Sequence, residues 1–542
     1  MKKKKIIEII FFILLFTFSW LLMWKTFRIN ESGNLEIAGK VSSDFAATIP
    51  LIRSFSFGQN WPPQYPLFAG PPIRYHFVFY AIAGFLEKAG VPLDWALNSL
   101  SILSFFFLLL VIYFLTKVIF KSRFVSMTAC FLFLFNGSFA FLEFFKKSPL
   151  SIHTLTDILH HDSFLAFGPY YGNKTISAFW SLNIYTNQRH LALAYAVFLL
   201  LILVIYRASQ KNNKLSLNKT LLWGIVIGLF PFIHLPVFAM MESALFVFLV
   251  IYPRLRKNIL VIVILSLIIA LPQMIYMGSS NYQGKLFHPG YLIENLNYLS
   301  FVKYWFLNLG LVTILAPIGF LLAKKPQRKI LLPFLALFVV GNLFQFSPEI
   351  AANHKFFNLF VIGANIFAAY FIHNLWKQKL FGKIATVFCF VPMVLSGVID
   401  IFPIKNDGYT EIKDGKNNEV EQFIINNTPK NSVFLNASYT YNPASLAGRK
   451  IFLGWPYFVW GTGYDSNKRY KILESIYKNT DKDGVCELST INKIDYITLE
   501  DINDPNLPRI NLDFFLANFE LAYNNKQLNF YIIDVKKNCF GF

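Results

Sequence analysis

The stretch ALNSLSILSFFFLLLVIYFLTKVI, residues 96–119, decides the fold class of this chain. Its only charged residue is Lys117, and the rest is apolar or small and polar. A helix of this length crosses the hydrocarbon core of a bilayer, which is about 30 Å thick. Lys121 and Arg123 follow at once, which is the charge pattern of a cytoplasmic loop. We therefore interpret the stretch as a membrane-spanning helix.

Runs of the same kind recur along the chain. They fall at residues 6–24, 96–119, 123–143, 189–206, 220–235, 237–252, 258–277, 301–322, 329–346, 356–376 and 383–401. The composition agrees, because 55% of the 542 residues are hydrophobic and only 15% are charged, fewer than a soluble chain of this size carries. We divide the segment 220–252 at His234–Leu235–Pro236, so that the basic segments on either side of it face the same side. The pattern predicts a polytopic α-helical membrane protein with about eleven spanning helices.

Positive charge is concentrated in the short segments between these runs. The formal net charge is +20, and Lys and Arg cluster at 2–5, 117–123, 207–219, 254–257, 324–329 and 377–383. If the N-terminus is cytoplasmic and each run crosses once, every cluster falls on the cytoplasmic side. The basic composition is therefore a positive-inside pattern, and we expect no nucleic-acid partner. The run at 6–24 is too long for the apolar part of a signal peptide, and no small-x-small site follows it, so we expect an uncleaved first helix.

The remaining long segments lie outside on this map, and they set the domain prediction. We expect a transmembrane domain at 1–403, with long outer loops at 25–95 and 144–188, and an extracytoplasmic α/β domain at 404–542. The apolar but interrupted stretch 76–88 indicates an interfacial helix. The protein is thus expected to be a multi-pass protein of a bacterial or archaeal inner membrane, with a cytoplasmic N-terminus and an extracytoplasmic tail.

The tail changes character at Ile404, where charged residues return and apolar runs shorten. The pattern predicts helices and strands in alternation, with helices at 419–425 and 467–477, strands at 433–435, 450–453 and 494–499, and a hairpin at 519–534. Cys486 and Cys539 both lie in this domain. An oxidising compartment permits a disulfide between them, and the sequence leaves their pairing open.

The first outer loop contains residues suited to sugar chemistry. Asp44 follows the first helix, an aromatic and proline-rich stretch occupies 57–70, and Arg74 and His76 come next. A carboxylate at the membrane surface can take a proton from an acceptor hydroxyl, and the rings can stack on sugar faces. The alternative interpretation is that Asp44 caps a helix that continues to Pro50.

These features together carry a family resemblance. An uncleaved first helix, a long outer loop with Asp44 soon after it, many hydrophobic helices and an exported α/β tail resemble the GT-C superfamily of integral-membrane glycosyltransferases. In this arrangement the chain is similar to the protein O-mannosyltransferases and the lipid A aminoarabinose transferases. The resemblance implies a polyprenyl-phosphate-linked sugar donor, transfer on the outer face, and Asp44 as catalytic base or metal ligand. Many members carry a second acidic residue beside the first, and this chain has Phe45 there.

Four basic residues at the outer ends of two runs are candidates for binding the donor phosphate. Arg189 and His190 stand at the start of the fourth run, and His354 and Lys355 stand just before the tenth. Lys355 places positive charge on the side that the positive-inside pattern disfavours, and a lipid phosphate is a physical reason for it. The alternatives are snorkelling at the interface or an ion pair with Glu349.

The second outer loop contains a candidate metal site. His153, Asp157 and His160 would share one face of a helix, at i, i+4 and i+7. Imidazole and carboxylate groups at this spacing are ligands for a divalent metal. The alternative is a hydrated polar loop, and the sequence indicates no cofactor besides this metal.

We therefore hypothesise a membrane glycosyltransferase that transfers a sugar from a polyprenyl-phosphate donor to an acceptor on the extracytoplasmic face. Asp44 would activate the acceptor hydroxyl, and the acceptor, a glycan, a lipid or a protein, is left open. The side chains expected to hold the donor phosphate are Arg74, His76, Arg189, His190, His354 and Lys355. The alternatives are a non-catalytic polytopic membrane protein and a transporter or flippase for lipid-linked sugars. A transporter is disfavoured because the polar residues gather at helix ends and the two halves of the chain are dissimilar.

Overall fold

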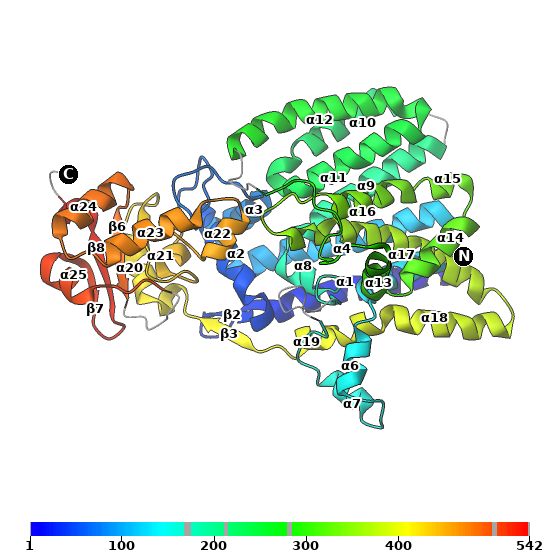
Figure 1. Ribbon diagram of the computed structural model, residues 1–542, viewed down its shortest axis with the longest axis horizontal. Helices are drawn as coiled ribbons and strands as arrows, with labels where there is room; N and C mark the ends of the chain where they lie inside the picture. The colour runs from blue at the N-terminus through cyan, green and yellow to red at the C-terminus, as the bar shows by residue number, and fades with distance from the viewer. Residues whose placement is uncertain (1, 167–174, 211–214, 279–283, 501–506, 540–542) are drawn as a thin grey trace. The chain divides into compact units, whose positions relative to one another are not determined.

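The computed structural model describes residues 2–166, 175–210, 215–278, 284–500 and 507–539, which separate into two compact units. Unit 1 comprises Met1–Thr26, Leu100–Gln273 and Gly284–Gly408, and unit 2 comprises Phe27–Ser99, Met274–Gln283 and Tyr409–Phe542. The tail therefore forms one unit with the first outer loop, a grouping that the predicted division at 403/404 does not contain. Most elements of both units are labelled in Figure 1.

Unit 1 is a bundle of apolar helices. Its helices, with the start of α4 and the end of α12 in unit 2, are α1 (Lys2–Thr26), α4 (Leu93–Phe120), α5 (Arg123–Leu134), α6 (Phe141–Lys147), α7 (Thr154–Leu159), α8 (Asn183–Asn187), α9 (Leu191–Gln210), α10 (Leu217–Gly228), α11 (Phe230–Ile251), α12 (Arg256–Met277), α13 (Tyr298–Leu309), α14 (Val312–Leu322), α15 (Lys325–Arg328), α16 (Leu331–Leu343), α17 (His354–Trp376), α18 (Leu380–Ile399) and α19 (Ile401–Lys405). α17 is central, because it packs against α5, α14, α16 and α18. Each apolar run of the sequence forms helix over most of its length, which confirms the predicted fold class.

Fewer helices are long enough to span than the sequence predicts. Among the described residues, seven helices have the length and apolar character of a span, or eight if α13 and α14, bent by 87°, count as one. The other predicted runs form α5, α10 and α16, with 12, 12 and 13 residues. A 12-residue helix is about 18 Å long and cannot cross the hydrocarbon core alone. In α1 and α12 only 28% of the apolar window is buried, which suits helices that face lipid.

The segment 220–252 contains the predicted break. His234 has non-helical backbone angles inside α11 and separates two helices across a kink, and Pro236 cannot donate to the helix ladder. α10 ends at Gly228 and α11 begins at Phe230, so a further helix boundary lies at Leu229. The predicted division at His234–Leu235–Pro236 is therefore present as a kink.

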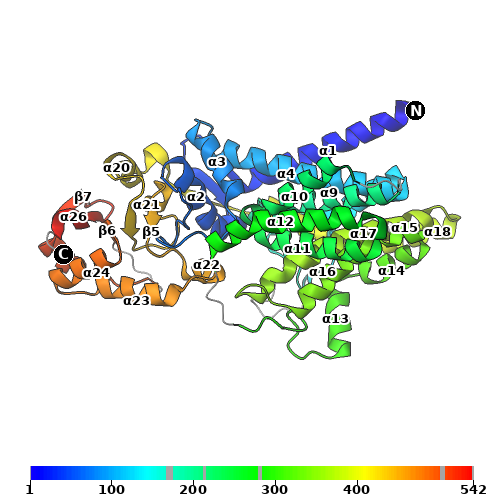
Figure 2. The same ribbon diagram turned by 90° about the horizontal axis from the view of Figure 1, so that it is seen from above.

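The basic segments of unit 1 are linked to one another at one end of the bundle. Glu8 binds Lys117 and, at 2.8 Å, Arg123. The remaining links are hydrogen bonds from Gln327 to Ile119 O (2.7 Å), from Lys329 to Ile251 O (3.1 Å) and from Asn258 to Leu215 O (2.9 Å), and a ring contact between Phe124 and His373. The N-terminus and α15 also lie toward the same side in both views (Figures 1 and 2). Clusters distant in sequence therefore share one end, as the positive-inside alternation requires.

Unit 2 combines two sheets with short helices. β1 (Phe27–Ile29), β2 (Leu35–Ala38) and β3 (Tyr409–Ile412) form an antiparallel sheet. A five-stranded mixed sheet has the order β5-β4-β6-β8-β7, in which β4 pairs in parallel with β5 and β6, and β8 pairs antiparallel with β6 and β7. These strands are β4 (Val433–Leu435), β5 (Lys450–Ile451), β6 (Tyr496–Glu500), β7 (Leu521–Asn525) and β8 (Phe530–Asp534). The helices are α2 (Ser42–Ser56), α3 (Val78–Lys88), α20 (Glu419–Asn427), α21 (Pro443–Leu446), α22 (Pro456–Gly461), α23 (Ser466–Tyr477), α24 (Lys482–Ile491), α25 (Leu512–Asn518) and α26 (Val535–Asn538).

The first outer loop is bound to the edge of the mixed sheet. Backbone hydrogen bonds join Ile451 N–H to Pro66 O (2.8 Å) and Gly454 N–H to Leu67 O (2.7 Å). Farther along, a Cβ on Gly58 would lie 2.1 Å from Gly448 O, so only glycine allows the two backbones to approach this closely. These contacts explain why the loop and the tail form one unit.

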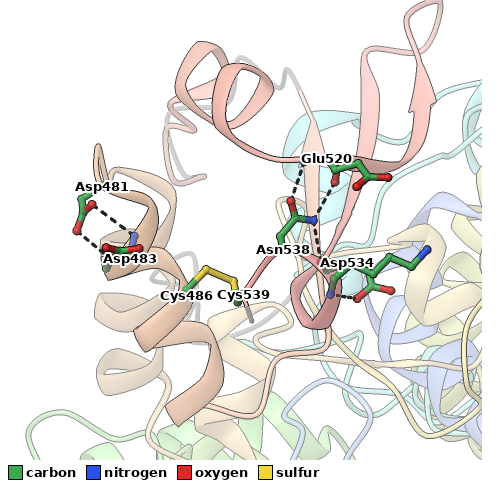
Figure 3. The surroundings of a disulfide bond; sticks show 9 residues. Asp481, Asp483, Cys486, Glu520, Asp534, Asn538 and Cys539 are labelled. Atoms are coloured by element: carbon green, nitrogen blue, oxygen red, sulfur yellow. Dashed lines mark hydrogen bonds between the residues drawn. A yellow bond between two sulfur atoms is a disulfide. The ribbon is translucent and has the colours of Figure 1, made fainter. Parts of the chain in front are cut away.

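Cys486 and Cys539 form a disulfide, with their Cα atoms 5.3 Å apart (Figure 3). The bond joins α24 to the residue after α26. Next to it, Asn538 accepts from Glu520 N–H (2.7 Å) and donates to Glu520 O (3.0 Å), which holds the same end of the chain (Figure 3). Closing a loop of 53 residues contributes about 4 kcal/mol in the chain-entropy estimate. The pairing that the sequence left open is therefore present.

Candidate functional site

Asp44 lies in the first turn of α2, the central helix of unit 2. Residues 45–56 of this helix are buried except for Ala47, whereas Asp44 is half-buried at the N-terminal end. The N-cap residue is Val41, and no side chain caps the helix. Asp44 is therefore not the cap that the alternative interpretation proposed, although its charge is favourable near the helix N-terminus.

Three tyrosines lie within electrostatic reach of the Asp44 carboxylate. Burial, the neighbouring Tyr464 and Asp44 raise the pKa of Tyr65 above its usual range. Burial, neighbouring tyrosines and Asp44 likewise raise the pKa of Tyr75. Burial and Asp44 raise the pKa of Tyr441, whose hydroxyl donates to Ser42 O. These phenols therefore stay protonated and present hydroxyl groups and ring faces, which are the groups that contact sugars.

Arg74 is held in the same unit by Tyr464. Its guanidinium lies 4.7 Å from the centre of that ring and donates to Gly463 O, and its backbone N–H donates to the Tyr464 hydroxyl (2.8 Å). The Tyr464 ring is stacked on Tyr65, with centroids 5.9 Å apart. Arg74 is thus connected through two rings to the surroundings of Asp44. His76 is buried beside Tyr75, with ring centroids 3.8 Å apart.

In unit 1 the structure brings together the candidates from the fourth and tenth runs. α9 begins just after His190, and α17 begins at His354. The Tyr195 hydroxyl donates to Lys355 O at 2.8 Å, which joins the first turns of the two helices. The Gln188 amide lies 3.5 Å from His354 Nε2. Both helices end near the basic segments, so these residues lie at the opposite end of the bundle.

Lys355 is the charged group of this cluster. Burial and then the Lys355 ammonium lower the pKa of His190 to about 3, so that imidazole is neutral at physiological pH. The ring of His234, at the kink of α11, lies 5.1 Å from the ring of His190. The His354 side chain is 3.2 Å from the Asn358 amide oxygen. A neutral His190 imidazole beside the Lys355 ammonium can donate a hydrogen bond without adding like charge.

Arg189 has a structural position. Its guanidinium is 1% exposed and donates to Thr186 O (2.8 Å) and to the Thr26 hydroxyl (2.7 Å). It also donates to the sulfur (2.8 Å) and the carbonyl oxygen (3.3 Å) of Met23. These bonds fasten the end of α1 to the segment before α9. Arg189 therefore positions His190 and is engaged with protein groups.

The candidate metal residues are separate and exposed. His153 precedes α7 and Asp157 lies within it, while the His160 Nδ1 is 2.9 Å from Thr156 O. His153 and His160 are exposed and Asp157 is half-buried. Within the described ranges, these three side chains do not form a group of metal ligands. The helix on which they were expected is present, but it spans only Thr154–Leu159.

Sequence reasoning missed a buried ion cluster in unit 2. Arg53 in α2 forms ion pairs with Glu87 (2.7 Å), Asp414 (2.8 Å) and Glu421 (3.0 Å). The cluster connects α2 and α3 to the segment before α20 and to α20 itself. Its members are far apart in the chain and follow no motif, so no local signal could have found it. A partner lost from such a buried cluster costs about 3–5 kcal/mol.

Asp44, Arg74 and His76 belong to unit 2, and Arg189, His190, His354 and Lys355 belong to unit 1. The predicted site is thus made of two groups of residues, each gathered within its own unit. Of the tyrosines around Asp44, Tyr65 and Tyr75 lie in the same outer loop, whereas Tyr441 comes from the tail, so its place beside Asp44 could not be predicted.

Comparison with known proteins gives similarity at the level of structure. No family model matches the sequence, and no curated protein matches it. The apo oligosaccharyltransferase of Archaeoglobus fulgidus has a TM-score of 0.47 at 12% identity, over 90% of this chain and 69% of that one. The same archaeal enzyme, AglB, in complex with an inhibitory peptide and a dolichol-phosphate has a TM-score of 0.45 at 12% identity over the same shares. Its complex with zinc and sulfate has a TM-score of 0.45 at 13% identity, over 89% and 67%. The chain is therefore similar over about 90% of its length to solved structures of an archaeal oligosaccharyltransferase, at 12 to 13% identity.

Proposed function

We propose that this protein is a membrane glycosyltransferase that moves a sugar from a polyprenyl-phosphate donor to an acceptor on the extracytoplasmic face. The observation that carries the proposal is the cluster around Lys355, which gathers at the end of unit 1 opposite the linked basic segments. The positive-inside rule assigns those segments to the cytoplasm, so the cluster faces the other side. An ammonium at that level of the membrane suits an anionic lipid headgroup.

Lys355 would neutralise the donor phosphate. As the bond between the sugar carbon and the phosphate oxygen breaks, negative charge grows on the departing polyprenyl phosphate, and a fixed ammonium stabilises that charge. His190 and His354, as buried imidazoles, would donate hydrogen bonds to phosphate oxygens. Arg74 and His76 are assigned to the same task from unit 2, and Arg189 holds His190 in position.

Asp44 would act as general base. Its carboxylate takes the proton of the acceptor hydroxyl while the acceptor oxygen attacks the sugar carbon and the phosphate leaves with the bonding electrons. The tyrosine hydroxyls near Asp44 would orient the sugar or the acceptor. Every step is carried by side chains, and a divalent metal at His153, Asp157 and His160 remains a separate prediction.

The orientation belongs to the same proposal. The shared basic end supports a cytoplasmic N-terminus, and the disulfide supports a tail in an oxidising compartment outside the cytoplasm. This arrangement corresponds to the inner membrane of a bacterial or archaeal cell.

A transfer assay tests the proposal. Purified full-length protein in neutral-lipid nanodiscs is incubated with a mixed acceptor fraction and with radiolabelled sugar supplied either on polyprenyl phosphate or on a nucleotide. We expect label to enter the acceptor fraction only from the polyprenyl-phosphate donors. Transfer from the nucleotide donor alone, or from neither donor across the common hexoses and pentoses, would contradict the proposal.

A further inference from the structure

Unit 2 contains a cavity of about 460 Å³ that the proposed chemistry does not use. It lies where the C-terminal ends of α2 and α3 meet the turn between α20 and β4. The lining residues that matter here are Phe55, Gln59, Trp61, Phe85, Lys88 and Lys430. Its size is typical of small-ligand sites. Phe55 is about 16 Å along α2 from Asp44, so the cavity is distinct from the surroundings of that carboxylate.

Trp61 presents its ring to solvent, and its side chain is 74% exposed. Within the part of the chain that the structure describes, neither the indole N–H nor the Gln59 side chain has a hydrogen-bond partner. The Lys88 and Lys430 ammonium groups likewise form no ion pair with a described residue. Four side chains with available donors thus converge on one concave surface. An exposed indole is unfavourable in water, so an exposed ring beside donors indicates a binding surface.

The segment that carries Trp61 is held firmly by the protein. The Asn60 amide donates to the Ser54 hydroxyl (2.9 Å) and to Gln64 O (3.0 Å), and its oxygen accepts from Gln64 N–H (2.9 Å). The Gln59 backbone N–H donates to Lys430 O (3.1 Å), which ties the two sides of the cavity together. A ligand would therefore meet preformed groups and would lose little affinity to the ordering of the site.

We propose that this cavity binds an acidic saccharide, such as a uronic acid oligomer or a phosphorylated sugar. The indole face stacks on the apolar face of a sugar ring, and the indole N–H and the Gln59 amide bind sugar hydroxyls. The two ammonium groups require negative charge on the ligand, since the lining contains no carboxylate. The concave shape and the single flat ring favour a sugar over a lipid headgroup. This binding does not depend on transfer activity.

The test is calorimetric titration of full-length protein in neutral-lipid nanodiscs. The probes are trigalacturonate and mannose 6-phosphate, with maltotriose and mannose as neutral counterparts. We expect at least one acidic probe to bind at least 10-fold more tightly than its neutral counterpart. Trp61→Ala should weaken that binding at least 10-fold, whereas Trp61→Phe, which keeps a stacking ring, should stay within a few fold. Lys88→Gln with Lys430→Gln should abolish the preference for the acidic probe.

Matched controls are available in the same unit. Trp460→Ala removes another exposed tryptophan, and Lys471→Gln with Lys493→Gln removes two exposed lysines elsewhere, so both should bind as the wild type does. The proposal would be overturned if neither acidic probe binds, or if each acidic probe binds no more tightly than its neutral counterpart. It would also be overturned if the Lys88 and Lys430 substitutions leave binding of the acidic probes unchanged and abolish only the binding of a soluble short-chain phosphatidylglycerol, because the cavity would then be a lipid site.

Discussion

The Lys355 ammonium and the neutral imidazole of His190 form the charged group and the hydrogen-bond donor of one cluster. Lys355 lies in the first turn of α17, and His190 directly precedes α9. Backbone N–H groups at the start of a helix also favour an anion. Snorkelling or a structural ion pair would also hold a lysine at this position. These explanations differ in what the removal of the charge should change.

Lys355→Ala should raise the Kd for polyprenyl phosphate about 10- to 100-fold, because a charge-assisted hydrogen bond contributes about 1.5–3 kcal/mol. Equilibrium binding of a radiolabelled polyprenyl phosphate to purified protein measures the change. Lys303→Ala, which removes an exposed lysine of α13, should leave the Kd unaltered. If Lys355→Ala lowers stability but leaves the Kd for polyprenyl phosphate unchanged, Lys355 has a structural role instead.

The ion cluster at Arg53 makes unit 2 sensitive to pH. Burial and then the neighbouring Asp414 raise the pKa of Glu421 above its ordinary 4.5. Above pH 4.5 the folded state therefore holds a proton that the unfolded state has lost, so stability falls as pH rises toward the raised pKa. We expect the thermal midpoint of the wild-type protein to decrease as the pH rises from 5 to 8. This carboxyl lowers the free energy of unfolding by at most about 1.4 kcal/mol per pH unit.

Glu421→Gln should flatten this dependence, because the amide has nearly the same shape and does not titrate. Glu419→Gln is the matched control, since Glu419 lies in the same first turn of α20 and is exposed. Thermal unfolding followed by intrinsic fluorescence at several pH values compares the three proteins. An equal slope in wild type and Glu421→Gln would show that Glu421 does not titrate in this range.

At the residue scale, the sequence gives a residue's position along a helix and not its neighbours across the bundle. Arg189, His190, His354 and Lys355 were placed at the same ends of two spans, and the structure gathers them. The hydrogen bonds of Arg189 to the end of α1 could not be foreseen, because hydropathy gives the depth of a helix and not its neighbours.

The helices of unit 1 show how far a pattern of apolar residues predicts an element. Every run formed helix over most of its length, yet the run at 123–143 is interrupted between α5 and α6, and the run at 220–235 has a helix boundary at Leu229. A glycine-containing stretch, WGIVIG at 223–228, explains the close packing of α10 on α12. A Cβ on Gly224 would lie 2.8 Å from Leu265, and one on Gly228 would lie 2.7 Å from Ile269 Cβ. Such spacing of small residues brings membrane helices together.

Gly228→Leu should therefore destabilise the protein by about 1–3 kcal/mol, because the added side chain has no space against α12. The thermal midpoint in detergent measures the effect. Leu222→Phe enlarges an exposed position of the same helix and should change the midpoint little. A wild-type midpoint for Gly228→Leu would mean that α10 and α12 are not packed through this face.

At the scale of the whole molecule, the proposed orientation rests on the two ends of unit 1. Basic segments are linked at one end of this unit by hydrogen bonds such as that from Gln327 to Ile119 O, across 208 residues of sequence. The loop after α12 binds the other end of α16, because His288 N–H donates to Leu343 O at 2.8 Å. The positive-inside rule then assigns this loop to the outside.

Cysteine labelling of intact cells tests this orientation. In a background with Cys130→Ser and Cys389→Ser, we expect Asn295→Cys to react with a membrane-impermeant maleimide. Lys257→Cys, in a basic segment, should react only after the cells are permeabilised. The reverse pattern would invert the protein in the membrane and would place Lys355 in the cytoplasm.

The sequence could not predict that the first outer loop and the tail form one unit. Hydropathy separates membrane runs from loops, and it places residues 25–95 and the tail outside the runs. Pairing between them depends on backbone hydrogen bonds such as that of Ile451 N–H to Pro66 O, which leave no periodic signal in either segment. The tail's own elements were predictable, because β4 and α23 follow apolar patterns and turn residues within a few positions.

The most direct measurement is sugar transfer by purified Asp44→Asn beside wild-type protein, with polyprenyl phosphate affinity determined for both. Loss of a general base should lower turnover about 100- to 10,000-fold and leave donor affinity and thermal stability unchanged. Asp513→Asn, which alters a first-turn carboxylate in another helix of unit 2, should transfer sugar at the wild-type rate. Wild-type turnover by a correctly folded Asp44→Asn protein would contradict the assignment of this carboxylate as the base.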